Sequence, residues 1–397
     1  MKGKCGLPVI EVSGKPFDMG RQAGHKCAKL AKAYKSSMAE SIEHYTGMSW
    51  AKAVSRGKLY LPHAEAFYPD FVEEIRGYSD GAKMPFEDAF TLCCHELLSP
   101  TGFKGCTDVA VNGDVTLEGD VLIGHNEDWS GDQLGAVVLL HAKPSKKPEF
   151  VTTAYAGLLP SSGMNSAGVS LTGNALSPND VRIGIPKVFP VRKVLEARRI
   201  GEALESAMPE GRASSYNNIC SDSNGEIYSL EGSATDCAVL YAHDGYLVHT
   251  NHYTADKMRR FEEDPSWTSC ATFRYNRAAR LIEGKLGRVT VESIASIFKD
   301  HVNRPGSICR HANPKVHPLE GSETIFSVVY DLTRLRAHVC RGKPCTGGMG
   351  TPPVVDRRPG RNRGSTARNT PTLSRLWSTL MPSRTRSGNL PPLPAPS

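Results

Sequence analysis

The spacing of apolar residues divides the chain into a helical first quarter and a longer part that is rich in strands. In residues 17–45 apolar side chains recur every three or four positions, from Ala23 through Cys27 to Ile42, which is the period of an amphipathic helix. Similar stripes follow in residues 67–78 and 86–97. Most of the first 98 residues are therefore predicted to be helical.

From Cys106 onward the apolar period changes to two, which is typical of β-strands. The sequences "NGD" and "EGD" predict hairpin turns on either side of a short strand at 115–117. Later strands are predicted in "LGAVVLLHA", "EFVTTAYAG", "GVSLTG", "NNICSDSNGEIYSLEGS", "DCAVLYAHDGYLVHTNH", "TIFSVVYDL" and "LRAHVC". Helices are predicted at 189–208, 272–285 and 291–301. Helices that bracket two blocks of strands predict an α+β fold with two packed sheets covered by helices.

Length and composition fit a globular protein, because 397 residues with 39% hydrophobic content can bury a sizeable core. No run of about 18 apolar residues occurs, and the N-terminus lacks an apolar stretch followed by a cleavage site of small residues. Eleven cysteines are scattered without a repeating spacing, which favours reduced thiols over a disulfide framework. We therefore expect a soluble, cytoplasmic protein that makes no contact with a membrane.

The formal charge of +7 is concentrated in the last part of the chain. Residues 351–397 contain eight Arg and one acidic residue, Asp356, so residues 1–350 sum to zero. The same segment has nine Pro and a single aromatic residue, Trp377, and such a composition predicts disorder. A basic arm that touches RNA or anionic lipid is the alternative, but aromatic residues are not interleaved with the arginines, so no nucleic-acid partner is expected.

Cys106 lies where the helical region gives way to the first predicted strand, in "GCTD". A nucleophilic thiol needs a base, and the α-amine of Cys106 would supply one, with a pKa of about 8, if the peptide bond before it were broken. Gly105 suits that cleavage because it has no Cβ to obstruct attack on its carbonyl. Taken alone, this position is better interpreted as a half-buried structural cysteine.

Five stretches together resemble one family. They are "GKPFDMGRQAGHKCAKL", "GCTD", "GHNEDW", "GMNSAGVSLTGNAL" and "TFRYNRAARL", and their order spans most of residues 8–346. The sequence resembles the self-processing N-terminal-nucleophile hydrolases of the acyl-CoA:6-aminopenicillanic acid acyltransferase type. This group includes arthropod β-alanyl-dopamine hydrolases and is more distantly related to bile salt hydrolases and acid ceramidases. The resemblance implies a four-layer αββα fold.

The resemblance also implies roles for individual residues. Gly105 and Cys106 match the cleavage and nucleophile positions, and Asp128 in "GHNEDW" would lie beside the new Cys106 amine and orient it. Asn174 and Asn251 resemble the pair whose amide groups form the oxyanion hole. Arg274 best matches the site arginine, although the nearby Arg277 leaves the register open.

Competing chemistry is weakly supported. "CCHE" at 93–96 offers metal-binding side chains, but Cys93 also fits the apolar stripe of its helix. His249 and His252 in "HTNH" could serve as ligands or as a partner for Cys106, but the resemblance assigns that loop to Asn251. No phosphate-binding loop is present. We therefore expect neither a cofactor nor a metal.

The resemblance implies that an inactive precursor is cut at Gly105–Cys106 into an α chain of residues 1–105 and a β chain with its catalytic core at 106–347. The two chains would stay associated, and residues 348–397 would form a tail. Hydrolysis of a small N-acyl or aminoacyl amine, such as a β-alanyl amine, is the favoured function, since nothing marks a CoA site. Transfer of an acyl group from acyl-CoA to an amine is the alternative, and a catalytically silent binding protein remains a third.

Overall fold

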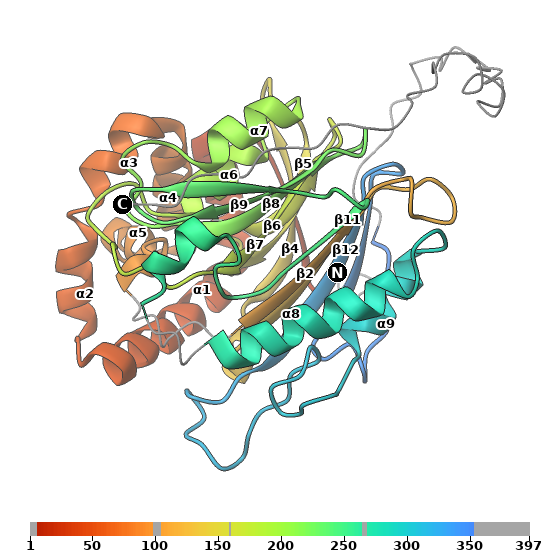
Figure 1. Cartoon of the computed structure of the whole chain (residues 1–397). Coiled ribbons are helices and arrows are strands. Elements are labelled where there is room, and N and C mark those ends of the chain that lie inside the picture. Colours follow the sequence, from red (N-terminus) through yellow and green to blue (C-terminus); the bar gives the residue numbers. More distant parts are fainter. Residues whose placement is uncertain (1–5, 98–104, 159, 264–267, 353–397) are drawn as a thin grey trace, which may run out of the picture. The chain divides into compact units, whose positions relative to one another are not determined.

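Two β-sheets pack face to face, and each is covered on its outer side by helices (Figure 1). The computed structural model describes residues 6–97, 105–158, 160–263 and 268–352, which belong to one compact unit. Strands β2 and β3 of one sheet contact strand β7 of the other, so the apolar faces of both sheets meet at the centre. The predicted four-layer αββα arrangement is confirmed.

The two sheets differ in size and in how their strands are ordered. The larger sheet has eight strands in the order β1 (Val9–Gly14), β4 (Val137–Pro144), β5 (Phe150–Tyr155), β6 (Pro160–Asn165), β7 (Val169–Ala175), β8 (Tyr216–Asp222), β9 (Ile227–Gly232) and β10 (Cys237–Tyr241). The smaller sheet has five strands in the order β11 (Tyr246–His249), β2 (Gly105–Val111), β3 (Leu122–Trp129), β12 (Glu323–Asp331) and β13 (Arg336–Arg341). Strand β2, which carries Cys106, is thus an inner strand.

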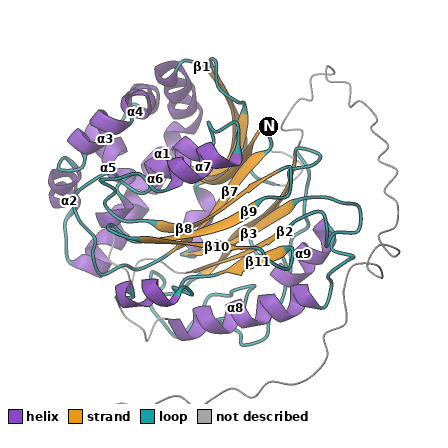
Figure 2. Ribbon diagram, turned by 45° about the horizontal axis from the view of Figure 1, so that its top comes forward, coloured by secondary structure: helices purple, strands orange, loops and turns teal. Residues whose placement is uncertain are grey.

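The helices lie in two groups on opposite sides of the sheets (Figure 2). Helices α8 (Thr268–Glu283) and α9 (Val291–Phe298) cover the five-stranded sheet. The other group lies on the side of the eight-stranded sheet and comprises α1 (Pro16–Thr46), α2 (Trp50–Gly57), α3 (Leu61–Phe67), α4 (Pro69–Ala82), α5 (Phe86–Leu92), α6 (Val188–Val194) and α7 (Ile200–Ala207). The predicted helical first quarter therefore supplies most of one outer layer.

Helices α1 and α4 cross in close contact because glycines face each other along both. A Cβ added to Gly24 would lie 2.1 Å from the carbonyl oxygen of Tyr78, and one added to Gly20 would lie 1.8 Å from that of Glu74. Gly77 and Gly81 approach the backbone of α1 as closely from the other side. The two helices can pack at this distance only without side chains there.

We expect Gly24→Ala to destabilise the protein by roughly 3 kcal/mol, because the added methyl group forces the two helices apart. Thermal unfolding followed by circular dichroism would measure the loss. Gly201→Ala in α7 is the matched control, since a Cβ at Gly201 meets nothing within 4 Å and should leave stability unchanged or slightly raised. An unchanged unfolding midpoint for Gly24→Ala would contradict the close crossing.

Three local predictions differ from the structure. The first 98 residues, predicted to be mostly helical, also include an edge strand, β1, which pairs in parallel with β4. Residues 115–117 form no strand among the described elements; Leu117 is 61% exposed and donates its N–H to Val289. The helix predicted at 189–208 is divided into α6 and α7, and the Asn165 side chain donates to the carbonyls of Leu195 and Ala197 between them.

The described chain extends slightly beyond the predicted boundary at residue 347, because Gly350 exchanges two backbone hydrogen bonds with Val339 of β13. The prediction of a disordered tail concerns mostly residues 353–397, which lie outside the described residues. In the part of the chain that the structure covers, no helix has the length and apolar character needed to cross a membrane.

Candidate active site

Cys106 is the second residue of β2, and it faces the space between the two sheets. Its side chain is only 5% exposed. The antiparallel register places Cys106 opposite Glu127 and Gly105 opposite Asp128 on β3. The sequence order "GCTD…GHNED" thus becomes a compact cluster, because a hairpin folds the two motifs onto neighbouring strands.

Gly105 lies in a crowded position. A Cβ at this position would lie 3.2 Å from Asp128 Oδ2 and 3.3 Å from Arg274 Nη2, which is closer than ordinary van der Waals contact. A side chain would therefore fit only if these groups moved by a few tenths of an ångström. Glycine before Cys106 leaves Asp128 and Arg274 in place.

Two predicted site residues hold the backbone of Cys106. Asn251 Oδ1 accepts the Cys106 N–H at 2.7 Å, while Asn251 Nδ2 donates to the Ala175 carbonyl at 3.0 Å. Arg274 donates to the Cys106 carbonyl through Nη1 and to Asn251 Oδ1 through Nη2, the latter at 2.8 Å. The side-chain amide of Asn251 therefore binds the backbone nitrogen of Cys106 through its oxygen.

The structure decides the register of the site arginine. Arg274 is 1% exposed and lies in contact with Cys106 and Thr107. Arg277, one helical turn later on α8, points elsewhere and pairs with Asp300 at 2.7 Å. Of these two arginines, Arg274 is thus the one that contacts Cys106.

Asp128 is fully buried opposite Gly105, and the Cys106 nitrogen is bound by Asn251 rather than by Asp128. Its Oδ1 accepts from Thr324 Oγ1 at 2.6 Å, and its Oδ2 lies 3.6 Å from Arg310 Nε. Burial raises the pKa of Asp128, while the charges of Arg310 and Arg274 act in the opposite direction. Sequence reasoning missed Arg310 and Thr324, which lie far from the motif in sequence.

The side chain of Asn174 is not brought to Cys106. Its Oδ1 accepts from Asn217 at 3.3 Å and lies 3.0 Å from His249 Nδ1, on the face of β7 away from the thiol. The neighbours Gly173 and Ala175 line the space around Cys106 instead, as the alternation of a strand requires. An oxyanion donor from this strand would accordingly come from its backbone.

A buried chain of polar groups that the sequence analysis did not identify lies against the thiol. Glu127 Oε2 is 3.9 Å from Cys106 Sγ and 2.6 Å from His125 Nε2, and His125 Nδ1 is 2.5 Å from Asp108 Oδ1. Tyr155 donates to Glu127 Oε1 at 3.0 Å, and Thr172 donates to the other oxygen of Asp108. The alternation of "HNED" along β3 puts His125 and Glu127 on one face.

Electrostatics distinguish the members of this chain. Burial acts to lower the pKa of His125, but Asp108 and Glu127 outweigh it and raise that pKa to about 10, so His125 is an imidazolium between two carboxylates. Burial and the charges of Glu127, Asp108 and Asp128 raise the pKa of the Cys106 thiol, whereas a hydrogen bond from the Ala175 backbone lowers it. The raised pKa favours the thiol form of Cys106.

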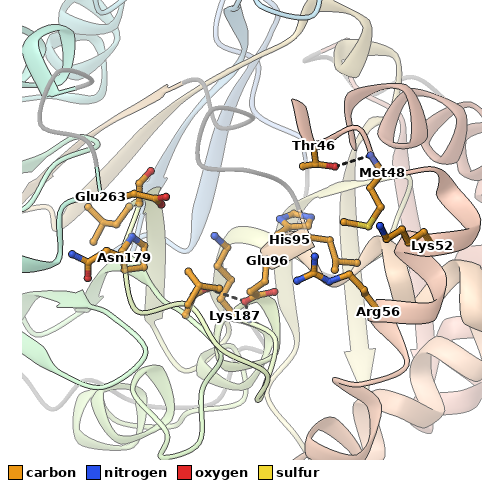
Figure 3. Close-up of a pocket in the computed structure, with 15 residues that line it drawn as sticks. Thr46, Met48, Lys52, Arg56, His95, Glu96, Asn179, Lys187 and Glu263 are labelled. Carbon is orange, nitrogen blue, oxygen red and sulfur yellow. Dashed lines mark hydrogen bonds between the residues drawn. The ribbon is translucent and has the colours of Figure 1, made fainter. Parts of the chain in front are cut away.

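The space around Cys106 adjoins a larger polar cavity of about 380 Å³. His95 lines both spaces, and the larger one also contains Lys52, Arg56, Glu96 and Lys187 (Figure 3). Burial and the nearby Lys187 lower the pKa of His95 to about 3, so it is neutral. The larger cavity beside the space around Cys106 thus carries side chains of both charge signs.

The competing sequence candidates have other roles. Cys93 and Cys94 are buried in the core and belong to none of the clusters of potential metal ligands among the described residues. His249 pairs with Glu231 at 2.9 Å, and it stacks on His252. Cys106, His125 and Glu127 lie close enough to share a cation, but the hydrogen bonds of His125 already account for their geometry.

Comparison with known proteins agrees with this arrangement. The family model of acyl-coenzyme A:6-aminopenicillanic acid acyl-transferase matches residues 115–345, which is more than half of the chain. The chain belongs to this family. The predicted resemblance is confirmed, and the protein is an enzyme of the hydrolase or acyltransferase type.

Relatives of both types are similar to this member of the family. The 40 kDa form of acyl-coenzyme A:6-aminopenicillanic-acid acyltransferase from Emericella nidulans is 27% identical over 84% of this chain and 92% of its own. The β-alanyl-dopamine/carcinine hydrolase of Drosophila melanogaster is 25% identical over 50% of this chain and 56% of its own. A variant of the conjugated bile acid hydrolase from Clostridium perfringens aligns with 65% of this chain and 100% of its own, at 14% identity and a TM-score of 0.45.

Proposed function

We propose that this protein cleaves itself between Gly105 and Cys106 and then hydrolyses the amide bond of a small N-acyl or aminoacyl amine through an acyl-enzyme on Cys106. The observation that carries the proposal is the setting of Cys106. Its nitrogen is held by Asn251, its carbonyl by Arg274, and its thiol lies 3.9 Å from a carboxylate. A cysteine that only fills the core has no need of these three contacts.

Self-cleavage requires a base other than an α-amine, since the Cys106 nitrogen is still an amide in the precursor. Glu127 is positioned to take the thiol proton, while the sulfur attacks the Gly105 carbonyl carbon. The C–N bond then breaks, and the proton passes to the leaving Cys106 nitrogen. Water hydrolyses the resulting thioester, which leaves a Gly105 carboxylate and a free Cys106 amine and thiol.

In the mature enzyme the new amine takes over as the general base. Asn251 Oδ1, which accepts the amide N–H in the uncut chain, would then orient this amine. The Cys106 thiol attacks the substrate carbonyl, and the amine of the substrate leaves with the proton that the α-amine took from the thiol. Water then hydrolyses the thioester between the acyl group and Cys106. The Ala175 backbone N–H, which acts on the thiol, is our candidate donor to the oxyanion.

The contacts between the two proposed chains favour their continued association. Strand β1 of the 1–105 segment pairs with β4 of the remainder over six residues. Tyr34 of α1 also stacks on Tyr155, which donates to Glu127, with ring centroids 5.6 Å apart. Separation would expose an apolar core and open a sheet edge, so both chains should remain in one particle.

The mass of the purified protein under denaturing conditions tests self-cleavage, and native mass tests association. We expect two fragments, the second of which begins at Cys106, in one native particle. Release of free amine from N-acyl and β-alanyl amines tests hydrolysis, and release of CoA from acyl-CoA in the presence of an amine tests acyl transfer. A chain that stays uncut and inactive would favour a silent binding protein, and CoA release coupled to acylation of the amine, without amide hydrolysis, would favour an acyltransferase.

Glu127→Gln should slow self-cleavage by about 100-fold, because it removes the carboxylate base yet keeps the size and the hydrogen bond from Tyr155. The rate is measured by gel electrophoresis after synthesis in vitro. Glu231→Gln is a matched control, since Glu231 is another buried carboxylate paired with a histidine, His249. Equal rates of cleavage for Glu127→Gln and the native protein would refute the assigned role.

Glu96 in the larger cavity is a candidate partner for the amino group of an aminoacyl substrate. Its Oε1 accepts from the Lys187 N–H at 2.8 Å and from Ser214 at 2.9 Å, whereas Oε2 is buried without a hydrogen-bond partner in the described part of the chain. Glu96→Gln should raise KM for a β-alanyl amine about 10-fold and leave kcat nearly unchanged. The N-acetyl analogue, which has no cation, serves as the control, and an equal effect on both would contradict this assignment.

A further inference from the structure

Four potential metal ligands meet near the surface of the smaller-sheet side, in segments that the site described above does not use. They are His301, Cys309, His311 and Cys345, and their ligand atoms all lie within 4.8 Å of one another. His301 is exposed, Cys309 is buried, and the other two are half-buried. From this cluster we propose a structural Zn²⁺ site of two thiolates and two imidazoles.

The distances from His311 to the other three ligands are close to those of a tetrahedral site. His311 Nε2 lies 3.1 Å from His301 Nε2, 3.5 Å from Cys345 Sγ and 3.8 Å from Cys309 Sγ. Zinc bonds of about 2.0–2.1 Å to nitrogen and 2.3 Å to sulfur give tetrahedral edges of about 3.3 Å between nitrogens and 3.6 Å between nitrogen and sulfur. Since every pair of ligand atoms lies within 4.8 Å, the side chains need to move by about an ångström or less to enclose an ion.

The ligand types select among metals. Two thiolates and two imidazoles in a tetrahedral arrangement suit Zn²⁺, while Mg²⁺ and Ca²⁺ prefer oxygen ligands. A metal at Nε2 puts the ring proton of His311 on Nδ1, where Arg304 lies 3.4 Å away. Arg304 is exposed, so it can turn into solvent without cost to the core.

The site would fix the segment that carries Arg310 into the active site. Arg310 lies between two of the ligands, donates its backbone N–H to Thr324 Oγ1 at 2.9 Å, and approaches Asp128 through Nε. The same segment is anchored from β3, since Asn126 Nδ2 donates to the Ile308 carbonyl at 3.1 Å. An ion that joins this loop to Cys345, beyond β13, thus stiffens the positively charged surroundings of Asp128.

Sequence spacing gave no indication of this site. Cys309 and His311 are separated by a single residue, and Cys345 lies far beyond them in the sequence. None of these cysteines belongs to a Cys-x-x-Cys pair, which is the usual signature of a zinc site. Only the return of the chain through β12 and β13 brings Cys345 back to the loop.

The metal content of the purified protein tests for the zinc site, and this test does not depend on the proposed enzymatic activity. Full-length protein without a tag is purified under reducing conditions, supplied with ZnCl₂ and desalted. Inductively coupled plasma mass spectrometry is then expected to find about one zinc per chain. Replacement of zinc by Co²⁺ should give thiolate-to-cobalt charge-transfer absorption together with strong tetrahedral ligand-field bands. Cys309→Ser and Cys345→Ser should each lose most of the metal and the charge-transfer band intensity.

Cys237→Ser is the matched control, because Cys237 is a half-buried cysteine of β10 outside the cluster, and it should retain the metal. Zinc retention below about one tenth per chain in the native protein would overturn the proposal. So would a cobalt form without thiolate charge transfer, or a Cys309–Cys345 disulfide that persists under the reducing conditions. The native-protein measurements decide the matter even if a serine variant fails to fold.

Discussion

Cys106→Ala is expected to give a single uncut chain with no measurable amidase activity. The substitution removes the sulfur that attacks Gly105 and later the substrate, and no other thiol among the described residues lines the same space. The measurement is intact mass under denaturing conditions after prolonged incubation, followed by an assay of amine release. The packing around this residue should survive, because alanine fits the space that cysteine occupies.

Two comparisons sharpen this result. Cys106→Ser retains a weaker nucleophile in the same place, so slow cleavage is expected where the alanine variant shows none. Cys220→Ala changes another fully buried cysteine, on β8, and should leave cleavage intact although it lowers stability. Cleavage of Cys106→Ala at the normal rate would eliminate Cys106 as the nucleophile of the maturation step.

Asp128→Asn is expected to slow self-cleavage by at least about 100-fold. The carboxylate neutralises part of the charge of Arg310, 3.6 Å away, and lies beside the Gly105 backbone. Its loss leaves buried positive charge beside the scissile bond and weakens the order of the groups around it. The fraction of cut chain over time after synthesis in vitro is the readout.

Asp331→Asn provides the control for general damage. Asp331 is also a buried carboxylate of the five-stranded sheet, and it pairs with Arg334 at 3.2 Å, but it lies opposite Leu122 at the far end of β3. Both variants should lose stability, whereas only Asp128→Asn should lose cleavage. If the two variants are cleaved at the same rate, the effect of Asp128→Asn is only structural, and the role assigned to Asp128 in self-cleavage is wrong.

The sequence alone determined the outline of the protein. Period-two and helical patterns located most strands and helices, because one buried face imposes a repeat that can be read locally. The motif order around Gly105 and Cys106 pointed to the correct family, and the structure brings Cys106, Asn251 and Arg274 into contact.

Only the tertiary structure decided which side chains face the thiol. Strand alternation turned Asn174 away, and the hairpin of β2 and β3 brought Glu127 and His125 against Cys106. On helix α8, Arg274 and not Arg277 contacts Cys106. Arg310 reaches Asp128 from a loop that is distant in the sequence. Most of these contacts join segments that are far apart in the chain, and the others depend on which face of a strand or helix points to the site. A local sequence pattern does not specify which distant residue a side chain will contact.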